Sequence, residues 1–349
     1  MIDLVVAGGG PAGLATAIHA ARAGLHTVVV EKRTGLIDKA CGEGLMPHAV
    51  GQLRQLGADP AGKPFLGISY FDAGHHVTAR FGSGAGLGVR RTTLHAALLA
   101  EARAAGVEMV HDKVGPVSQD ADGVTVNGLR SRYLAAADGL HSPIRTALGL
   151  ERPAGGTRRW GIKRHVEVAP WSEFVEVYWA GGRAGPGAAG AGAAAEAYVT
   201  PVADDCVGIA VLTSRQGRFE QHLEAFPELR ERLDGHAHQP DRAAGPLRQR
   251  VRSRVAGRVL LVGDAAGYVD ALTGEGLGLA FAASRLLVDS VVADRPQDYE
   301  RHWRRATRRY RILTAGMLHA STSPLRSFIV PAASTFPRVF SGAVNLLGN

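Results

Sequence analysis

The chain has 349 residues, of which 46% are hydrophobic and 21% charged, as in an ordinary globular protein long enough for two structural units. Its formal charge of +8 comes mostly from arginine, and no nucleic-acid-binding motif accompanies it, so we expect no nucleic-acid partner. Two cysteines, Cys41 and Cys206, indicate no disulfide framework and fit a reducing compartment. No apolar run is long enough to span a bilayer, and no cleavable leader precedes the first predicted strand, so we expect a cytoplasmic protein.

A glycine-rich turn follows the first apolar run. The predicted strand over 2–7 leads into Gly8-Gly9-Gly10-Pro11-Ala12-Gly13, a helix is expected over 14–23, and the strand over 26–30 ends at Glu31 and Lys32. In such a β-α-β unit Gly8 permits the tight turn, Gly10 lets the backbone approach a pyrophosphate, and Gly13 lets the helix pack on the strand. Free N–H groups at the helix start hold the anion, and Glu31 can accept hydrogen bonds from a ribose diol. The complete context predicts a dinucleotide site rather than a simple glycine-rich loop.

The predicted elements that follow alternate between helix and strand and then become mostly strand. We expect a strand pair over 66–71 and 76–81, a helix over 92–105, strands over 107–110, 124–126 and 133–137, and antiparallel strands over 163–168, 174–179, 196–200 and 207–212. The Gly/Ala run Gly181–Ala195 predicts a mobile surface loop. A strand over 258–262 and a helix over 277–292 restore the first pattern, and helices broken by Pro324, Pro331 and Pro337 are expected at the end.

This order predicts an α/β protein with an interrupted nucleotide-binding domain. Its segments are 1–65, 84–154 and 256–295, and the inserted, mainly antiparallel sheet domain comprises 66–83 and 155–255. The remaining residues, 296–349, form a C-terminal helical segment.

Two later motifs, together with the first, resemble the signatures of a known family. Ala137-Asp138-Gly139-Leu140-His141-Ser142-Pro143-Ile144-Arg145 and Leu261-Val262-Gly263-Asp264-Ala265-Ala266-Gly267 are similar to motifs of FAD-dependent hydroxylases of the p-hydroxybenzoate hydroxylase type and of the related geranylgeranyl reductases. The resemblance covers residues 1 to about 290. It implies a Rossmann-like domain of the glutathione-reductase type, resident FAD, and NAD(P)H as a reductant that visits without a fingerprint of its own.

The same resemblance implies roles for single residues. Asp264, after Gly263, is similar to the acid that binds the ribityl hydroxyls of FAD, and a helix N-cap is its alternative role. Gly274-Glu275-Gly276 would pass beside the isoalloxazine ring, and the helix from Leu277 would direct its N-terminus at the flavin. Arg91 matches an arginine that contacts FAD, and its alternative role is a surface cap of the following helix. Asp138 matches the acid of an Asp-Gly motif, and its alternative role is that of a plain turn residue.

The chain departs from the hydroxylase pattern in its later motif. Gly267 and Ala271 stand where hydroxylases have His and Pro, and this segment is closer to geranylgeranyl reductases. So is Cys41-Gly42-Glu43-Gly44, which makes Cys41 either a thiol facing the flavin or a small buried residue. A reductase needs a proton donor, and Cys41 and Glu43 are candidates, although Glu43 can equally lie in solvent.

The substrate strand leaves the reaction open between oxygenation and reduction. Tyr198-Val199-Thr200-Pro201 keeps only the Tyr and Pro of the reductases' Tyr-x-Trp-x-Phe-Pro, which puts prenyl saturation in doubt. The Trp-x-Trp-x-Ile-Pro motif of related halogenases is missing, which disfavours halogenation. Strand alternation allows only one face of 174–179 to line the pocket. The candidates for its wall are aromatic: Trp160, Phe174, Tyr178, Trp179 and Tyr198. Tyr198 is also a candidate catalytic residue, together with Cys41 and Glu43.

Two further groups of residues carry weaker signals. The pairs His75-His76 and His236/His238 lack partners at metal-ligand spacing, so we expect no metal site. The basic run Arg301–Arg311 predicts a solvated helix face or, since apolar helices follow it, a peripheral contact with a membrane.

Taken together, these patterns predict an FAD-dependent oxidoreductase. The first interpretation is an NAD(P)H-dependent monooxygenase that uses molecular oxygen on a lipophilic or aromatic small molecule, as in secondary metabolism. The alternatives are a geranylgeranyl-reductase-like enzyme that reduces a carbon–carbon double bond, and a non-catalytic flavin-binding protein. The substrate, the choice between NADH and NADPH, and the oligomeric state are not predicted by any pattern in the chain.

Overall fold

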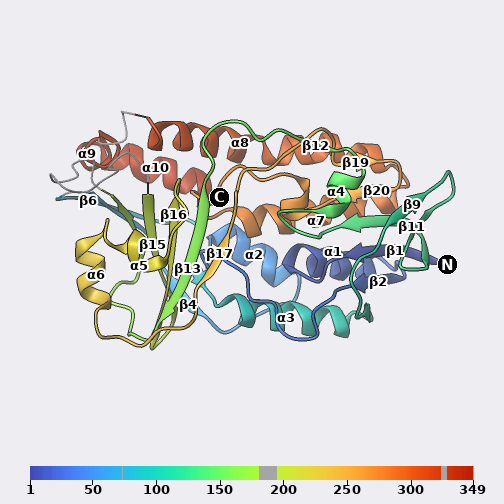
Figure 1. Ribbon diagram of the computed structural model, residues 1–349, viewed down its shortest axis with the longest axis horizontal. Coiled ribbons are helices and arrows are strands. Elements are labelled where there is room, and N and C mark those ends of the chain that lie inside the picture. Colours follow the sequence, from blue (N-terminus) through green and yellow to red (C-terminus); the bar gives the residue numbers. More distant parts are fainter. Residues whose placement is uncertain (73, 181–194, 324–327, 349) are drawn as a thin grey trace.

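The computed structural model describes residues 1–72, 74–180, 195–323 and 328–348. Two sheets lie next to each other along the long axis of the molecule, and helix α8 (Pro296–Ser321) runs beside both (Figure 1). The α/β fold class is confirmed, and the structural elements show why the site forms where it does.

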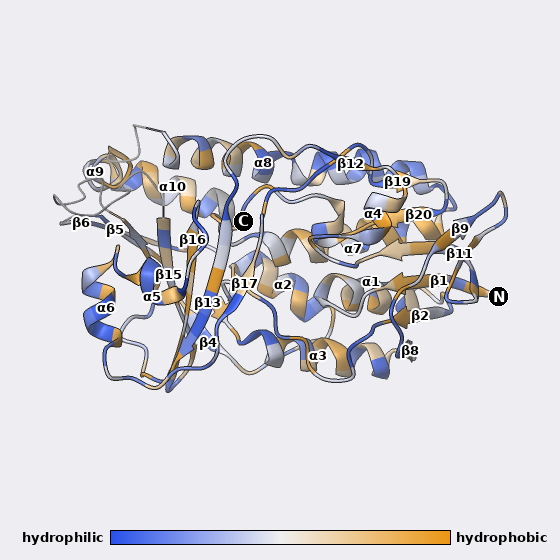
Figure 2. Cartoon of the chain, viewed as in Figure 1, coloured by the Kyte–Doolittle hydropathy of each residue, from blue (hydrophilic) through white to orange (hydrophobic). Residues whose placement is uncertain are grey.

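The first sheet is built on parallel strands, in the order β19-β20-β11-β1-β2-β8 with β10 and β9 attached to β11. Its strands are β1 (Ile2–Ala7), β2 (Thr27–Val30), β8 (Glu108–Val110), β9 (Val117–Gln119), β10 (Val124–Val126), β11 (Leu129–Ala136), β19 (Val255–Ala256) and β20 (Val259–Leu261). The central strands are almost wholly apolar, because a parallel sheet is covered on both faces (Figure 2). The helices that belong with it are α1 (Pro11–Arg22), α2 (Pro47–Gln55), α3 (Arg91–Ala104), α4 (Pro143–Ala147) and α7 (Gly276–Val292).

Parallel register brings four strand ends to one edge of this sheet. Ala7 pairs with Val30 and with Ala136, and Ala136 pairs with Leu261. The turns that follow β1, β2, β11 and β20 therefore leave the sheet side by side, as expected at the carboxyl edge where such folds bind their ligands.

The second sheet has the order β17-β13-β16-β15-β14-β5-β6, and all its pairs are antiparallel except β14 with β5. Its strands are β5 (Gly67–Asp72), β6 (His75–Arg80), β13 (Trp160–Val166), β14 (Val175–Trp179), β15 (Ala195–Ala203), β16 (Cys206–Thr213) and β17 (Arg242–Ala244). Smaller strand groups are β3 (Gly44–Leu45), β4 (Lys63–Phe65) and β7 (Gly86–Gly88), and β12 (Glu151–Arg152) with β18 (Arg250–Val251). The remaining helices are α5 (Phe219–Leu223), α6 (Pro227–Leu233), α9 (Ile329–Thr335) and α10 (Pro337–Gly348).

Several boundaries differ from the sequence predictions. Helix α1 begins at Pro11, since proline at the first helical position has the required φ and lacks an N–H that would be unpaired there. Pro331 does not break a helix but lies in the first turn of α9, where its missing N–H costs no hydrogen bond. Strand β9 was not predicted. Ala73, Pro324 and most of the predicted loop Gly181–Ala195 lie outside the described residues.

A buried charge cluster joins the second sheet to the loop that precedes α7. Arg159, just before β13, is 1% exposed and pairs with Glu196 on β15 and, at 3.6 Å, with Asp270 in that loop. Because buried charges are tolerated only when they are paired, this guanidinium holds the loop against the sheet.

We predict that Arg159→Met destabilises the protein by roughly 3–5 kcal/mol, since two buried carboxylates lose their shared cation. Urea unfolding followed by circular dichroism measures the change. Arg22→Met is the matched control, because the Arg22 side chain is 42% exposed in its pair with Glu101; a surface pair contributes only about 0–1 kcal/mol. Equal effects of the two substitutions would contradict a structural role for the cluster.

Candidate functional site

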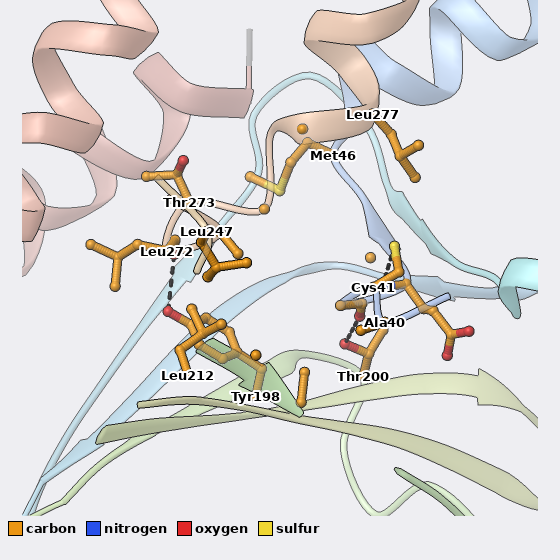
Figure 3. A pocket seen from close by; sticks show the side chains of 18 of the residues that line it. Ala40, Cys41, Met46, Tyr198, Thr200, Leu212, Leu247, Leu272, Thr273 and Leu277 are labelled. Carbon is orange, nitrogen blue, oxygen red and sulfur yellow. Dashed lines mark hydrogen bonds between the residues drawn. The ribbon is translucent and has the colours of Figure 1, made fainter. Parts of the chain in front are cut away.

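A cavity of about 440 Å³ lies between the carboxyl edge of the first sheet and one face of the second. Its polar end is lined by the glycine turn after β1 and by charged side chains, and its other end by apolar side chains of β5, β14 and the C-terminal helices. Figure 3 shows part of its lining, with Cys41 and Thr200 on one side and Tyr198 and Leu272 on the other. The sequence-predicted residues Gly10, Pro11, Ala12, Arg91, Gly263, Asp264, Gly274, Gly276 and Leu277 all line it.

The glycine turn forms an open cradle in front of α1. Gly8 has φ +110°, and a Cβ there would lie 2.5 Å from the carbonyl oxygen of Ala137. A Cβ on Gly13 would lie 1.9 Å from the Gly8 oxygen, so glycine is required for the helix to pack on the turn. In contrast, a Cβ on Gly10 would meet no atom within 4 Å. The space beside Gly10 therefore lies open before the helix N-terminus, where an anion binds.

Glu31 lies against this turn. Its Oε2 accepts a hydrogen bond from the Gly9 N–H at 2.9 Å, and its Oε1 accepts one from the Arg33 N–H at 3.0 Å. The Lys32 side chain is exposed and does not line the cavity, and its role in cofactor binding stays a prediction. The chain turns outward after β2, and Lys39 is the lysine of this segment that reaches the cavity.

The Gly-Asp motif forms the short 3₁₀ helix η1 (Gly263–Ala266) against the start of α1. Gly263 has φ +63°, and a Cβ there would lie 2.7 Å from the Cβ of Ala12, so the close approach requires glycine. Asp264 lines the cavity, as the resemblance implied.

Arg145 connects the Gly-Asp motif to the Asp-Gly motif. It is 1% exposed and donates hydrogen bonds to the carbonyls of Leu140 at 2.9 Å and Ala265 at 3.3 Å, and to Oε1 of Gln249 at 2.8 Å. Asp138 does not line the cavity; its Oδ2 accepts a hydrogen bond from the Ile144 N–H at 3.1 Å at the start of α4. Burial raises the pKa of the Asp138 carboxyl. Asp138 thus holds the loop that Arg145 joins to η1.

Helix α7 begins at the cavity, but the side chain of Glu275 turns away from it. Gly274, Gly276 and Leu277 line the cavity, whereas the Glu275 carboxylate pairs with His48 of α2 at 2.8 Å and is 5% exposed. Burial raises the pKa of the Glu275 carboxyl. If this loop contacts the isoalloxazine ring as predicted, the contact is made by the backbone of Gly274 and Gly276. Glu275 instead fixes α7 on α2.

Cys41 lies half-buried on the cavity wall, so the alternative of a fully buried cysteine is excluded. Its Sγ accepts a hydrogen bond from the Glu43 N–H at 3.4 Å. The Thr200 hydroxyl on β15 donates to the Gly42 carbonyl at 2.9 Å and ties this segment to the second sheet (Figure 3).

Glu43 is at the centre of a buried ion cluster, not in solvent. It is 2% exposed, and its carboxylate accepts hydrogen bonds from Lys163 Nζ at 2.9 Å, His165 Nε2 at 2.6 Å and the Arg91 N–H at 2.7 Å. Burial alone raises the pKa of Glu43, but hydrogen bonds and positive charge from His165 and Lys163 outweigh it and hold the pKa below its usual value. Glu43 is therefore ionised, and Lys163, which is among the residues that line the cavity, also pairs with Asp38 at 3.2 Å.

The apolar end of the cavity selects one face of β14. Val175, Val177 and Trp179 line the cavity, whereas Phe174 and Tyr178 point away, with Tyr178 stacked on Phe71 at 4.9 Å between ring centroids. Trp160 is also absent from the lining, so Trp179 and Tyr198 are the candidates for the aromatic wall that line the cavity. Tyr198 does line the cavity, but its hydroxyl donates to the Leu272 carbonyl at 3.0 Å, and burial raises its pKa well above the usual range. Tyr198 is a wall residue that holds the loop before α7.

Sequence reasoning missed Lys163, His165, Lys39 and His95. Lys163 and His165 alternate along β13 toward the cavity side, so a lysine at an inward strand position was the available signal. His95 lies on the buried face of α3, and one ring nitrogen, Nε2, lies 2.9 Å from the Gly9 carbonyl oxygen. Among the described residues there is no cluster of side chains suited to a metal, and no helix is both long and apolar enough to cross a membrane.

The residues present fit FAD. The open cradle at Gly10, the acid at the end of β2, and the Asp264 carboxyl at the cavity wall match in order the pyrophosphate, ribose and ribityl groups of such a cofactor. The N-terminus of α7 lies at the same cavity, and its positive dipole end would favour negative charge on a flavin bound there.

Comparison with known proteins agrees with this geometry. The family model "FAD binding domain" matches residues 1–291. A menaquinone reductase from Mycobacterium tuberculosis is 29% identical over 98% of this chain and 91% of its own, and a rifampicin monooxygenase from Streptomyces venezuelae is 28% identical over 80% and 61%. The structure of the flavin-dependent brominase Bmp2 superimposes with a TM-score of 0.79 at 15% identity, over 99% of this chain and 93% of that one, which shows a shared fold. The chain therefore belongs to the FAD-binding-domain family and is an FAD-dependent oxidoreductase.

Proposed function

We propose that the protein reduces a carbon–carbon double bond in a lipophilic, isoprenoid-type molecule, with NAD(P)H as the source of electrons. The observation that carries the proposal is the apolar half of the cavity. Beyond the charged end, its lining from β5, β14 and the C-terminal helices consists of alkyl and aromatic side chains, among them Ile68, Val175, Val177, Trp179, Ile329 and Phe340. The similarity to a menaquinone reductase, which spans nearly the whole chain, supports this function over the monooxygenase that the sequence placed first.

The protein supplies position and a proton in this reaction, and bound FAD supplies the hydride. Of the three predicted catalytic residues, Glu43 is ionised and the Tyr198 hydroxyl is committed to the Leu272 carbonyl. Of these three, Cys41 is the one whose side-chain proton is used in no described hydrogen bond, and we propose that it protonates the second carbon of the double bond. The hydrogen bonds from Thr200 to Gly42 and from Glu43 to Cys41 fix the thiol in place.

Lys163 has a second role in this proposal. Lys163 lines the cavity, and its ammonium group pairs with Glu43 and Asp38. Because an ammonium group has three N–H donors, we propose that the third donates a hydrogen bond to a substrate oxygen. A carbonyl or hydroxyl head group is therefore expected at the charged end of the cavity, with the hydrocarbon part directed toward the C-terminal helices.

Hydroxylation is the second candidate function. It is supported by the similarity to a rifampicin monooxygenase over 80% of the chain. The two reactions differ in mass, because hydroxylation adds one oxygen atom from O₂ and double-bond reduction adds two hydrogen atoms without O₂.

A lipophilic substrate also gives a reason for apolar side chains on the outer surface of the C-terminal helices. Phe328, Phe336 and Val339 are 66%, 62% and 72% exposed, and their neighbours Ile329, Val330 and Phe340 line the cavity. Apolar side chains in such a place insert into the interfacial layer of a bilayer. We therefore propose that these helices contact a membrane peripherally and receive the substrate from it.

Gly10→Ala tests the FAD cradle. The new Cβ meets no protein atom, so folding is unchanged, but it occupies space that the pyrophosphate needs; the affinity for FAD should fall roughly tenfold or more. The measurements are the FAD-to-protein ratio after purification and an FAD titration. Gly51→Ala on α2, where a Cβ also meets nothing within 4 Å, is the control. Wild-type FAD affinity in Gly10→Ala would overturn the assignment of the cradle.

Cys41→Ala tests the proton donor. With NADPH and a prenylated quinone under anaerobic conditions, kcat for the product heavier by two hydrogens should fall roughly 10²–10⁴-fold, while reduction of the flavin by NADPH is unchanged. Cys206→Ala is the control, because Cys206 is buried on β16 away from the cavity. Unchanged turnover in Cys41→Ala contradicts the role of the thiol. A product that forms only in air and is heavier by one oxygen atom favours hydroxylation instead.

The double variant Phe336→Ser, Val339→Ser should lower co-sedimentation with vesicles of anionic phospholipid, because it removes the exposed apolar side chains. Met109→Ser, which also removes an exposed apolar side chain, but from β8, should bind vesicles as the wild type does. If both variants sediment equally, the C-terminal helices are not the contact.

A further inference from the structure

A second cavity, of about 830 Å³, borders the first across the Gly-Asp motif. It lies between the segment 248–254 and helices α7 and α8. It shares five lining residues with the first cavity, which we call the flavin cavity: Gly263, Asp264, Tyr268, Gly276 and Ala280. We call it the arginine cleft after its lining. Arg152, Arg248, Arg250 and Arg252 come from β12, β18 and their flanks, and Arg308 and Arg311 from α8.

The charge of the arginine cleft is not balanced within the described part of the chain. Arg254 and Arg304 also line it, but Glu300 pairs with them at 2.8 Å and 2.6 Å. The six arginines named above form no ion pair with a described carboxylate, and Asp264 is the single carboxylate among the described lining residues. A cleft lined by one sign of charge focuses its field and concentrates ions of opposite charge. The ligand that fits is therefore an anion with several charges.

The chemistry of the lining favours phosphate groups. The planar guanidinium fork matches two phosphate oxygens at once, which is why arginine predominates in phosphate sites. The arginines come from two separate elements, the β12/β18 segment and α8, which form two parts of the wall, so two phosphate groups can be held at once. The cavity volume is in the range of small-molecule sites rather than of a single-ion site.

The position of the cleft restricts the ligand further. The chain has one dinucleotide fingerprint, and its cradle fits FAD, so a second dinucleotide must place its phosphates elsewhere. The cleft meets the flavin cavity at Tyr268, so a ligand whose phosphates lie on the arginines can extend toward the flavin.

We propose that the arginine cleft binds the phosphates of a pyridine dinucleotide with a 2′-phosphate, one arginine group holding the pyrophosphate and the other the 2′-phosphate. This inference rests on the proposed function, because it is the proposed double-bond reduction that requires a reductant. In the transfer of electrons from this dinucleotide, the dihydropyridine gives up a hydride, which carries two electrons, and becomes a pyridinium cation. The flavin that accepts the hydride thereby gains one negative charge. Free phosphate and lipid head groups share this chemistry and are distinguished in the test.

The test compares two double variants of the FAD-loaded protein. Arg252→Gln, Arg308→Gln removes one arginine from each wall, and Arg305→Gln, Arg309→Gln removes two exposed arginines of α8 outside the cleft. By calorimetry, the Kd of 2′,5′-ADP should rise roughly 10- to 100-fold in the first and stay unchanged in the second. The KM for NADPH should rise in parallel while kcat at saturation is retained, and NADH should show a much smaller change.

Equal binding of 2′,5′-ADP by the two variants overturns the proposal. The proposal is also overturned if the cleft variant loses binding to inorganic phosphate or to anionic vesicles while its Kd for 2′,5′-ADP is unchanged. Reduction of the flavin by dithionite bypasses the cleft: failure to reduce any double bond under these conditions counts against the proposed function alone, and the calorimetric result for the cleft stands independently.

Discussion

The in-register parallel sheet is the constraint on which the site depends. Ala7, Val30, Ala136 and Leu261 lie at one level, so four turns that are far apart in sequence leave the sheet together. Two of these turns require glycine for their close approach to α1 and β11, and the others supply acids. A slip of one residue in any strand would move its turn by about 3.3 Å and reverse the faces of its side chains, which the buried strands do not tolerate.

Buried charges hold the loops around the cavity. Arg145 joins the two later motifs, Arg159 joins the loop before α7 to the second sheet, and Glu43 joins the Cys41 segment to β13. Each charge is costly to remove from water and is stable only when all its partners are present. Such clusters select one arrangement of the loops rather than adding much net stability, and the proposed reaction, which must align a thiol, a ring and a substrate, would need that selection.

The local parts of this structure could be predicted from the sequence, and the partnerships between distant parts could not. Glycine spacing and apolar periodicity predicted β1, α1, β2 and α7, because the requirement for each is met within about twenty residues. The ionised state of Glu43 depends on Lys163, 120 residues away, and the turning of Glu275 toward His48 depends on the packing of α7 on α2. Neither contact leaves a periodic signal, since each depends on how separate elements meet.

The two cavities differ in polarity, and this difference would separate the reductant and the substrate of the proposed reaction. A phosphate group placed in the apolar cavity would lose its hydration without gaining a cation, and a hydrocarbon chain placed on the arginines would strip water from unpaired guanidinium groups. Each site therefore rejects the other's ligand through desolvation. Because the two cavities share Asp264 and Tyr268 beside the proposed flavin position, a reductant held on the arginines and a substrate held on the apolar side chains would each reach the flavin from its own cavity.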